Sequence, residues 1–142
     1  MDKKKDLADK LRNSGLRPTK QRIKLAEYLF NRDKTFHFTV ETLNKGINKK
    51  NSEDKIALAT IYNTVHAFKK TGHLKEILLK EGKNYFDTNT SSHHHFYDEI
   101  NNELTDIDNN KIELKKFPTP PRGKSIKNVN VIINIDNDNH NH

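Results

Sequence analysis

The chain has 142 residues, no cysteine and a formal net charge of +7. Because only 32% of the residues are hydrophobic and 32% are charged, two small domains suit the composition better than one compact core. The lack of cysteine excludes disulfides, thiolate zinc sites and thiol catalysis, so histidine, carboxylate or backbone groups would have to hold any metal. No apolar run approaches the roughly 18 residues that span a bilayer, and we expect a cytoplasmic protein with no membrane contact.

Positive charge is concentrated in the first part of the chain. Residues 1–87 contain 20 Lys and Arg against 11 Asp and Glu, a net charge of +9, whereas residues 88–142 contain 6 against 8, a net charge of −2. Such asymmetry favours a polyanionic partner, such as nucleic acid, for the first part. A lysine-rich solvated surface would also explain the charge, so the motifs must decide.

Three amphipathic helices are predicted in the first half. Thr19 is the expected N-cap of the first, in "LRPTKQRIKLAEYLFN", and Thr39 is that of the second, in "FTVETLNKGI". The third, in "ALATIYNTVHAFKKTG", ends at Gly72, which can adopt a left-handed conformation. The apolar positions of the three helices are, in turn, Ile23, Ala26, Leu29 and Phe30; Val40, Leu43 and Ile47; and Ile61, Val65 and Phe68.

The outer side of the third helix mixes an aromatic ring, an amide and cations. It carries Tyr62, Asn63, His66, Lys69 and Lys70. A solvated helix face explains the lysines, but it leaves Tyr62 and Asn63 unexplained.

The next stretch, "HLKEILLKEGKNYFDT", indicates two short strands around Glu81, Gly82 and Lys83. Helices followed by a hairpin indicate a winged helix-turn-helix. In that arrangement the last helix enters the major groove, and the hairpin lies over the DNA backbone with its lysines near phosphates.

Behind Asp87 the composition becomes polar and rich in asparagine, and "DTNTSS" is the expected hinge. Short strands are predicted at 95–98 and 103–107, and a clearer one in "NVNVIINID", with Val129, Val131, Ile133 and Ile135 at every second position. "FPTPPRG" must be extended or turned, because its three prolines prevent a regular strand ladder. So few strands bury little surface alone, and we expect a second copy to complete the sheet in a homodimer.

The run "SSHHHFYDEINNELTD" indicates a metal site. In a strand, side chains two residues apart share a face, so His93 and His95 point the same way and His94 points the opposite way. The other candidate ligands are Asp87 before the run, Asp106 after it, and His37. The alternative is a polar loop with three histidines in solvent.

Four stretches, "SGLRPTKQR", "HFTVETL", "LATIYNTV" and "YFDTNTSSHHHFYD", resemble the ferric uptake regulator family in order and spacing, within a match from Leu7 to Ile135. Within the family, "IALATIYNTVHAFKKTGHLKEI", "NELTDID" and "FPTPPRG" resemble the iron response regulator branch, which responds to haem. The resemblance implies an α+β fold. Its expected parts are an N-terminal winged helix-turn-helix DNA-binding domain at 1–87, a hinge at 88–92, a small C-terminal α/β dimerisation and ligand-sensing domain at 93–136, and a disordered tail at 137–142.

The resemblance also implies a homodimeric transcriptional repressor, not an enzyme, that binds an AT-rich, pseudo-palindromic operator in double-stranded DNA. A regulatory divalent ion, which is iron, manganese or zinc, is implied at His37, Asp87, His93, His95 and Asp106. Haem, as a further regulatory ligand, is implied at His93, His94 and His95. The resemblance implies DNA contacts at Tyr62 in the major groove and at Arg17 in an AT-rich minor groove. The other predicted DNA contacts are Thr60, Asn63, Lys69 and Lys83.

Three departures from the family matter. Many relatives have arginine where this chain has Asn63, and because asparagine can form two hydrogen bonds to adenine, the operator can differ. The paired CxxC zinc motifs are absent, with Asp98 and Asn101 near the position of the first pair, so no structural thiolate zinc is expected. The Cys-Pro haem motif is also missing, so haem would depend on histidine ligands.

Two other classes of function fit less well. A His/Asp metallohydrolase needs an open coordination position and a general base, and no signature such as H-E-x-x-H occurs. A winged-helix module that binds nucleic acid without sensing a ligand explains the charge but not the His/Asp set. Within the family, a divalent-metal sensor without a haem response is the alternative to the haem-responsive branch.

Overall fold

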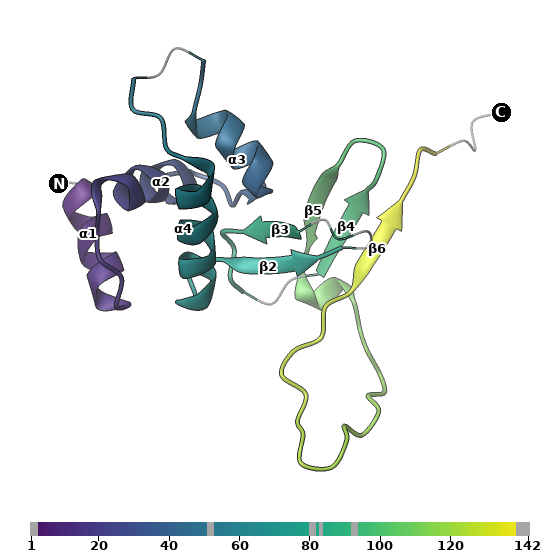
Figure 1. The fold of residues 1–142 in the computed structure, drawn as a ribbon. Helices are drawn as coiled ribbons and strands as arrows, with labels where there is room; N and C mark the ends of the chain where they lie inside the picture. Colours follow the sequence, from purple (N-terminus) through teal and green to yellow (C-terminus); the bar gives the residue numbers. More distant parts are fainter. Residues whose placement is uncertain (1–2, 51–52, 80–81, 83, 92–93, 139–142) are drawn as a thin grey trace. The chain divides into compact units, whose positions relative to one another are not determined.

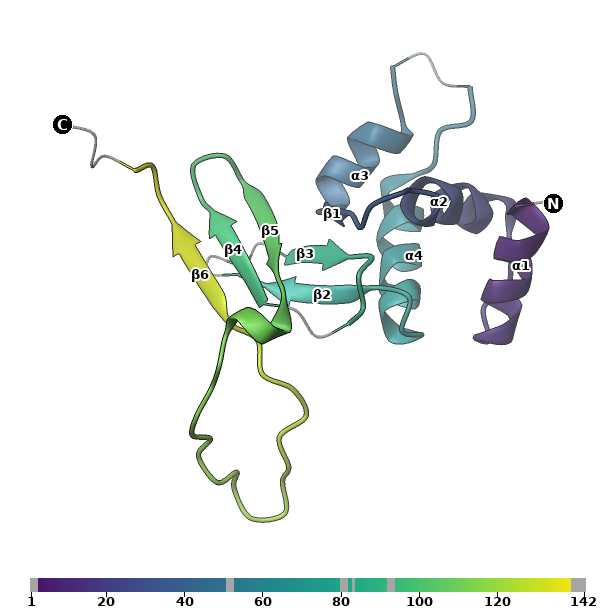
Figure 2. The same ribbon diagram turned by 180° about the vertical axis from the view of Figure 1, so that it is seen from behind.

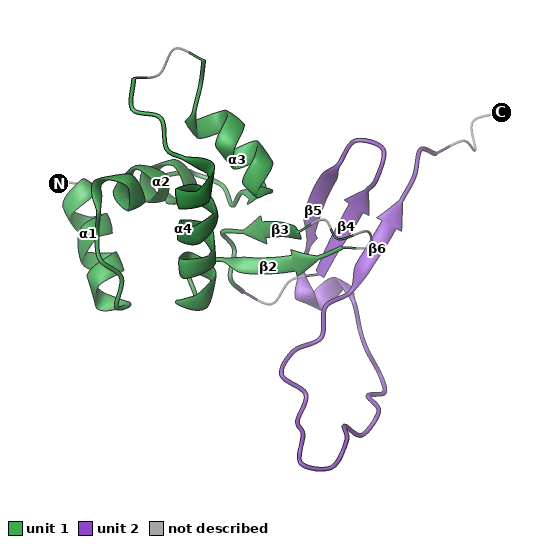
Figure 3. Ribbon diagram, in the orientation of Figure 1, with its two compact units in different colours: residues 1–90 green, residues 91–142 purple. Residues whose placement is uncertain are grey.

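The computed structural model describes residues 3–50, 53–79, 82, 84–91 and 94–138, and the chain divides into two compact units, residues 1–90 and 91–142 (Figure 3). The first unit contains α1 (Lys3–Asn13), α2 (Lys20–Phe30), β1 (His37–Phe38), α3 (Val40–Ile47), α4 (Leu58–Lys70), β2 (Lys75–Leu78) and β3 (Asn84–Asp87) (Figure 1). The second contains β4 (His94–Asp98), β5 (Glu103–Ile107), the 3₁₀ turn η2 (Asn109–Lys111) and β6 (Ile132–Ile135).

Three helices of the first unit, α2, α3 and α4, begin or end at the predicted residues. The Thr19 hydroxyl accepts a hydrogen bond from the Arg22 N–H at 3.2 Å, and the Thr39 hydroxyl accepts one from the Thr42 N–H at 3.1 Å. The Thr42 hydroxyl in turn accepts one from the Thr39 N–H at 2.9 Å, so α3 begins with a reciprocal capping box. Gly72 follows α4 with a φ of 85°, a conformation that glycine adopts without strain. The three predicted helices are therefore confirmed.

Two elements of this unit are missing from the sequence-based prediction. Helix α1 buries only Leu7, Ala8 and Leu11 among mostly charged side chains, so its apolar pattern is short. Strand β1 has two residues and is defined by its pairing with β3. Periodicity along the chain cannot detect a strand of that length.

One apolar core fills the first unit. Helices α2, α3 and α4 and strand β3 contribute side chains that are at most 2% exposed, among them Leu25, Leu29, Leu43, Ile61, Phe68 and Phe86. The antiparallel sheet has the order β1-β3-β2, in which β2 and β3 form the predicted hairpin and β1 adds to the other edge of β3. Figure 2 shows the helices and this sheet from behind. The pairing of β1 with β3 brings together residues that are 50 positions apart, such as His37 and Asp87.

The second unit is a three-stranded sheet in the order β5-β4-β6, with β4 antiparallel to β5 and parallel to β6. The strands predicted at 95–98 and 103–107 are confirmed. The strand predicted from Val129 begins only at Ile132, because the Val131 N–H donates to Nδ1 of His94 at 2.9 Å rather than to a strand carbonyl. Among the described residues of this unit, Tyr97 and Ile107 are the buried apolar side chains. From 112 to 131 the chain has neither helix nor strand, which agrees with the effect of its prolines.

Thr88 belongs to the first unit, although it was predicted as the start of the hinge. Its N–H donates to the Phe36 carbonyl at 3.1 Å, and its hydroxyl accepts from the Phe36 N–H at 2.9 Å. The contact between the segments of β1 and β3 therefore continues one residue beyond Asp87. Most of the predicted tail, residues 139–142, lies outside the described residues. In the part of the chain that the structure describes, no helix is long and apolar enough to cross a membrane.

Candidate metal ligands and DNA-binding surface

His37 and Asp87 form a buried contact in the sheet of the first unit, which we term the first His–Asp pair. The two residues lie opposite each other on β1 and β3, and His37 Nε2 is 3.1 Å from Asp87 Oδ2. The Asp87 side chain is 1% exposed and the His37 side chain 17%. The other oxygen of Asp87, Oδ1, accepts a hydrogen bond from the Asn89 N–H at 2.8 Å. Both residues are fixed locally, because His37 lies two positions before the Thr39 cap and Asp87 ends β3.

His95 and Asp106 form a similar contact in the sheet of the second unit, which we term the second His–Asp pair. They lie opposite each other on β4 and β5, and His95 Nε2 is 3.1 Å from Asp106 Oδ1. The His95 side chain is 2% exposed and the Asp106 side chain 24%. The His95 N–H donates to the Val131 carbonyl at 3.1 Å, so the chain before β6 holds this part of β4 in place.

Each pair has the chemistry of a metal half-site. An imidazole nitrogen and a carboxylate oxygen are both ligands of iron, manganese and zinc. Because the ligands of a metal must be deprotonated, a divalent cation can replace the proton shared within such a pair. Four of the five predicted metal ligands are thus found in two pairs, one in each unit. The fifth, His93, lies outside the described residues.

His94 is buried as well, with 5% of its surface exposed, and it has a structural hydrogen bond. Its Nδ1 accepts from the Val131 N–H at 2.9 Å. A neutral imidazole has one acceptor nitrogen, so Nε2 of His94 carries the proton. Neither nitrogen then offers a lone pair to haem iron, and haem ligation by His94 would require loss of this contact. Since His94 and His95 are both buried, the alternative of solvent-exposed histidines is wrong for these two residues.

Asp98 and Asn101, near the position of the missing CxxC motif, hydrogen-bond to each other. The Asn101 Nδ2 atom donates to Asp98 Oδ2 at 2.9 Å, and the N–H groups of Asn101 and Ile100 donate to Oδ1 at 3.1 and 3.0 Å. These hydrogen bonds, first those from Asn101 and then that from Ile100, hold the pKa of the Asp98 carboxyl below its usual value. The turn between β4 and β5 is therefore closed by an aspartate and an asparagine rather than by thiolates.

Helix α4 presents an apolar and aromatic surface to solvent. Tyr62 is 53% exposed, and Leu58, one turn earlier, is 54% exposed. The Tyr62 ring packs against His66 with centroids 4.4 Å apart, and His66 meets Phe86 edge-on. The other predicted DNA contacts on this helix are the exposed Asn63 and the half-buried Thr60. Leu58 was not predicted, although its position four residues before Tyr62 places it on the same helix face.

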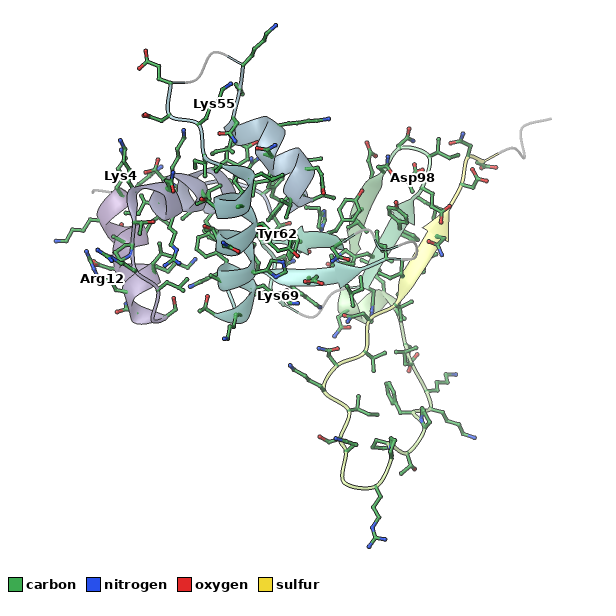
Figure 4. All side chains as sticks on the ribbon, viewed as in Figure 1. Lys4, Arg12, Lys55, Tyr62, Lys69 and Asp98 are labelled. Carbon is green, nitrogen blue, oxygen red and sulfur yellow. The ribbon has the colours of Figure 1, made fainter. Side chains whose placement is uncertain are left out.

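The predicted cationic DNA contacts differ in their surroundings. Lys69, which Figure 4 labels with Tyr62 on α4, has its Nζ 2.7 Å from Oε2 of Glu76. Lys69 is thus paired with a carboxylate of β2 in the absence of DNA. Arg17 is exposed before α2, and its carbonyl accepts from Nη1 of Arg22 at 3.1 Å, so a second guanidinium that was not predicted lies beside it. Lys83 lies outside the described residues.

Sequence comparison gives one family and several relatives. The family model described as the Ferric uptake regulator family matches residues 13–134. The chain is 32% identical to the peroxide operon regulator of Bacillus subtilis over 91 residues, which are 64% of this chain and 60% of that protein. It is 32% identical to the peroxide-responsive repressor of Staphylococcus epidermidis over 97 residues, which are 68% of this chain and 62% of that protein. These matches therefore cover less than two thirds of the relatives' length.

Structural comparison confirms the predicted α+β fold, with a winged-helix part and a small sheet part. The ferric uptake regulator of Vibrio cholerae has a TM-score of 0.68 at 20% identity, over 90% of this chain and 97% of that chain. The ferric uptake regulator of Pseudomonas aeruginosa, solved with manganese, has a TM-score of 0.66 at 20% identity, over 91% of this chain and 96% of that chain.

Proposed function

Because the chain belongs to the ferric uptake regulator family, we propose that it is a metal-sensing transcriptional repressor that binds double-stranded DNA as a homodimer. Members of the family are transcription regulators and not enzymes, in agreement with the prediction of no catalytic role. The observation that carries the metal part of the proposal is the presence of two buried His–Asp pairs, each with a nitrogen–oxygen distance of 3.1 Å.

In this proposal both His–Asp pairs bind one divalent ion. Together they supply two imidazole nitrogens and two carboxylate oxygens, a set that suits iron, manganese or zinc, with His93 as a further predicted ligand. An ion bound by ligands from both units would limit their relative orientation. That limit would set the spacing of the two α4 helices in a dimer, which is a physical route from metal to DNA affinity.

Helix α4 is the proposed reading helix in the major groove. The exposed side chains of Tyr62 and Leu58 suit contacts with thymine methyl groups, and Asn63 can form two hydrogen bonds to adenine. Arg17 and Arg22, at the start of α2, suit phosphate or minor-groove contacts. Lys69 contributes less in this proposal, because Glu76 already neutralises part of its charge.

DNA binding in the presence and absence of metal tests the proposal. A duplex is selected from a random pool, and its affinity is measured with Mn²⁺ and with a chelator for the native chain and for Asp87→Asn. Metal should raise the affinity of the native chain, typically by about 5- to 150-fold for allosteric coupling. Asp87→Asn should lose this response but keep its weak binding to random DNA.

The matched control for the metal response is Asp98→Asn, because the Asp98 carboxyl closes a turn and belongs to neither pair. This variant should keep the response. A native metal response in Asp87→Asn would contradict the role of the first pair. For base reading, Tyr62→Ala should weaken the selected duplex more than random DNA, and an equal loss on both would contradict the role of Tyr62.

A haem response, as in the iron response regulator branch, is the alternative to a response to the divalent metal alone. Neither the peroxide regulators nor the structures named above are described as haem-responsive, and the hydrogen bond at His94 Nδ1 counts against that ligand. Haem titration of the native chain and of a variant with all three histidines of the run replaced by alanine tests this alternative. Haem-dependent release of DNA by the native chain alone would establish it, and an identical DNA affinity with and without haem would exclude it.

Peroxide is a second candidate signal, favoured by the two relatives that are named as peroxide regulators. The test is DNA affinity before and after H₂O₂ treatment of protein loaded with Fe²⁺, with Zn²⁺-loaded protein as the control because zinc has no redox chemistry. Loss of affinity in the iron form only would support a peroxide response. Unchanged affinity in both forms would exclude it.

A further inference from the structure

Charge is segregated within the second unit. Residues 113–127, which we term the arm, contain five basic side chains and one acidic one. The rest of the unit, 91–112 and 128–142, contains seven acidic side chains and one basic one. The arm therefore carries a net charge of +4, and the rest of the unit carries −6, apart from the histidines.

The arm also carries apolar side chains that are exposed in its own chain. Leu114, Phe117 and Ile126 are 41%, 53% and 48% exposed. The arm belongs to the long loop that extends from the sheet before β6, and it contains no helix or strand (Figure 3). Exposed apolar side chains grouped in one segment are typical of a surface that binds another protein surface.

The sheet offers a surface that matches the arm. A hollow of about 430 Å³ is lined by four apolar side chains and three charged ones, which are Phe96, Ile107, Ile112 and Ile133, and Asp106, Asp108 and Lys111. Phe96 and Ile133 are neighbours in the register of β4 and β6, and they remain 36% and 37% exposed. The hollow thus combines exposed apolar groups with the acidic side chains of the same sheet.

We propose that the arm of one chain binds in this hollow on a second copy, so that two chains exchange their arms. Phe117 supplies the apolar anchor, and the basic side chains of the arm face the acidic sheet of the partner. The inference rests on the proposed homodimer and adds which segment forms its contact.

The exposure of both the arm and the hollow favours the second copy over the arm's own chain. Phe117, Thr119 and Pro120 each precede a proline, which keeps residues 117–121 extended. Ile112, five positions before Phe117, lines the hollow on one side of the arm in the sequence, and Ile133 lines it on the other. Within its own chain the arm leaves the hollow uncovered, because Phe117 is 53% exposed while Phe96 and Ile133 in the hollow are 36% and 37% exposed.

Disulfide cross-linking tests the arm exchange, because the native chain has no cysteine to interfere. Full-length chains carrying Phe117→Cys and Ile133→Cys, with different affinity tags, are co-expressed, purified through both tags and mildly oxidised. We expect a covalent heterodimer. The control replaces the second chain with Ile100→Cys, since Ile100 is 57% exposed but lies in the turn at the far end of β4. Cross-linking in the control should be at least about tenfold slower.

Light scattering on the same proteins separates failure of the arm inference from failure of the proposed homodimer. A dimer without the 117–133 cross-link would overturn the arm exchange and leave the homodimer standing, whereas a monomer would overturn both. A double variant of one chain, Phe117→Cys with Ile133→Cys, that forms only an internal disulfide would also overturn the exchange. A Lys115→Ala/Lys116→Ala variant that loses DNA affinity while cross-linking through Phe117→Cys is unchanged would overturn the charge contact of the arm, because these two lysines would then be DNA contacts.

Discussion

The two units differ in how completely they bury their apolar side chains. In the first unit, Phe38, Leu43, Phe68 and Phe86 are at most 2% exposed and belong to one core. In the described part of the second unit, Tyr97 and Ile107 are buried, while eight large hydrophobic side chains are at least 36% exposed. Apolar burial is the main favourable term in folding, so the first unit has a sufficient core of its own and the second depends on what else covers its sheet.

The two His–Asp pairs reflect the same difference. Asp87 lies at the edge of a packed core and is 1% exposed, whereas Asp106 lies on a small sheet and is 24% exposed. The first pair therefore has a rigid scaffold, and the second lies on an element whose order depends on its partners. A ligand that must be held by both pairs can stabilise the weaker unit, since binding to the folded state alone shifts the folding equilibrium.

The largest expected effect is a loss of stability, and replacing one phenylalanine by alanine in each unit tests it. Phe68→Ala removes a fully buried ring from the core of the first unit and should lower its free energy of unfolding by about 3–5 kcal/mol. Phe117→Ala removes a ring that is 53% exposed and should leave the stability of the first unit within about 0.5 kcal/mol of the native value. Urea unfolding followed by circular dichroism measures both, and equal losses would contradict the contrast.

A smaller effect is expected at the start of α3. Thr39→Ala removes the hydroxyl that accepts from the Thr42 N–H, and it should destabilise the first unit by about 1 kcal/mol. Thr90→Ala is the control, because Thr90 is exposed at the end of the unit and caps no helix. Thermal unfolding of both variants checks the prediction, which would be wrong if they unfolded at the same temperature.

The smallest effect concerns pH. Burial and, next, the positive charge of Lys10 lower the pKa of His73 in the folded state below its ordinary value of 6.5. The unfolded chain therefore binds the proton more tightly, so the contribution of His73 is fully present above about pH 6.5 and is lost as the pH falls through the lower folded pKa. Stability should decrease on acidification less steeply in His73→Gln than in the native chain. Urea midpoints at several pH values test this, and parallel curves would contradict it.

Much of the first unit could be predicted because its signals are local. Threonine caps, apolar spacing and the glycine after α4 each act within a few residues of the chain. The short strand β1 could not be predicted, because it exists through a partner some 50 positions away, as the contact from His37 to Asp87 shows. In the second unit, the alternation that begins at Val129 predicts a longer strand than β6, since nothing in that pattern reveals the hydrogen bond from Val131 to the side chain of His94.

For the candidate site too, the sequence indicated the residues but not the contacts between distant parts of the chain. Residue types and the resemblance to the family pointed to the four residues of the two pairs, but the sequence could not show that each histidine faces its aspartate across a strand pair at 3.1 Å. It also gave no sign that Lys69 forms an ion pair with Glu76, because the two residues lie on different elements. Contacts between different elements, such as these, depend on tertiary packing and not on local pattern.

Metal stoichiometry tests most directly whether the two pairs bind one ion. The measurement is Mn²⁺ bound per chain, by equilibrium dialysis, in a background with His140→Ala and His142→Ala to remove tail histidines, for the parent chain, Asp87→Asn and Asp106→Asn. One shared ion predicts one site in the parent chain, and an affinity at least about 10–100-fold weaker for that same site in each variant. Two sites in the parent chain, with one of them intact in each variant, would contradict the shared ion and assign a separate ion to each pair.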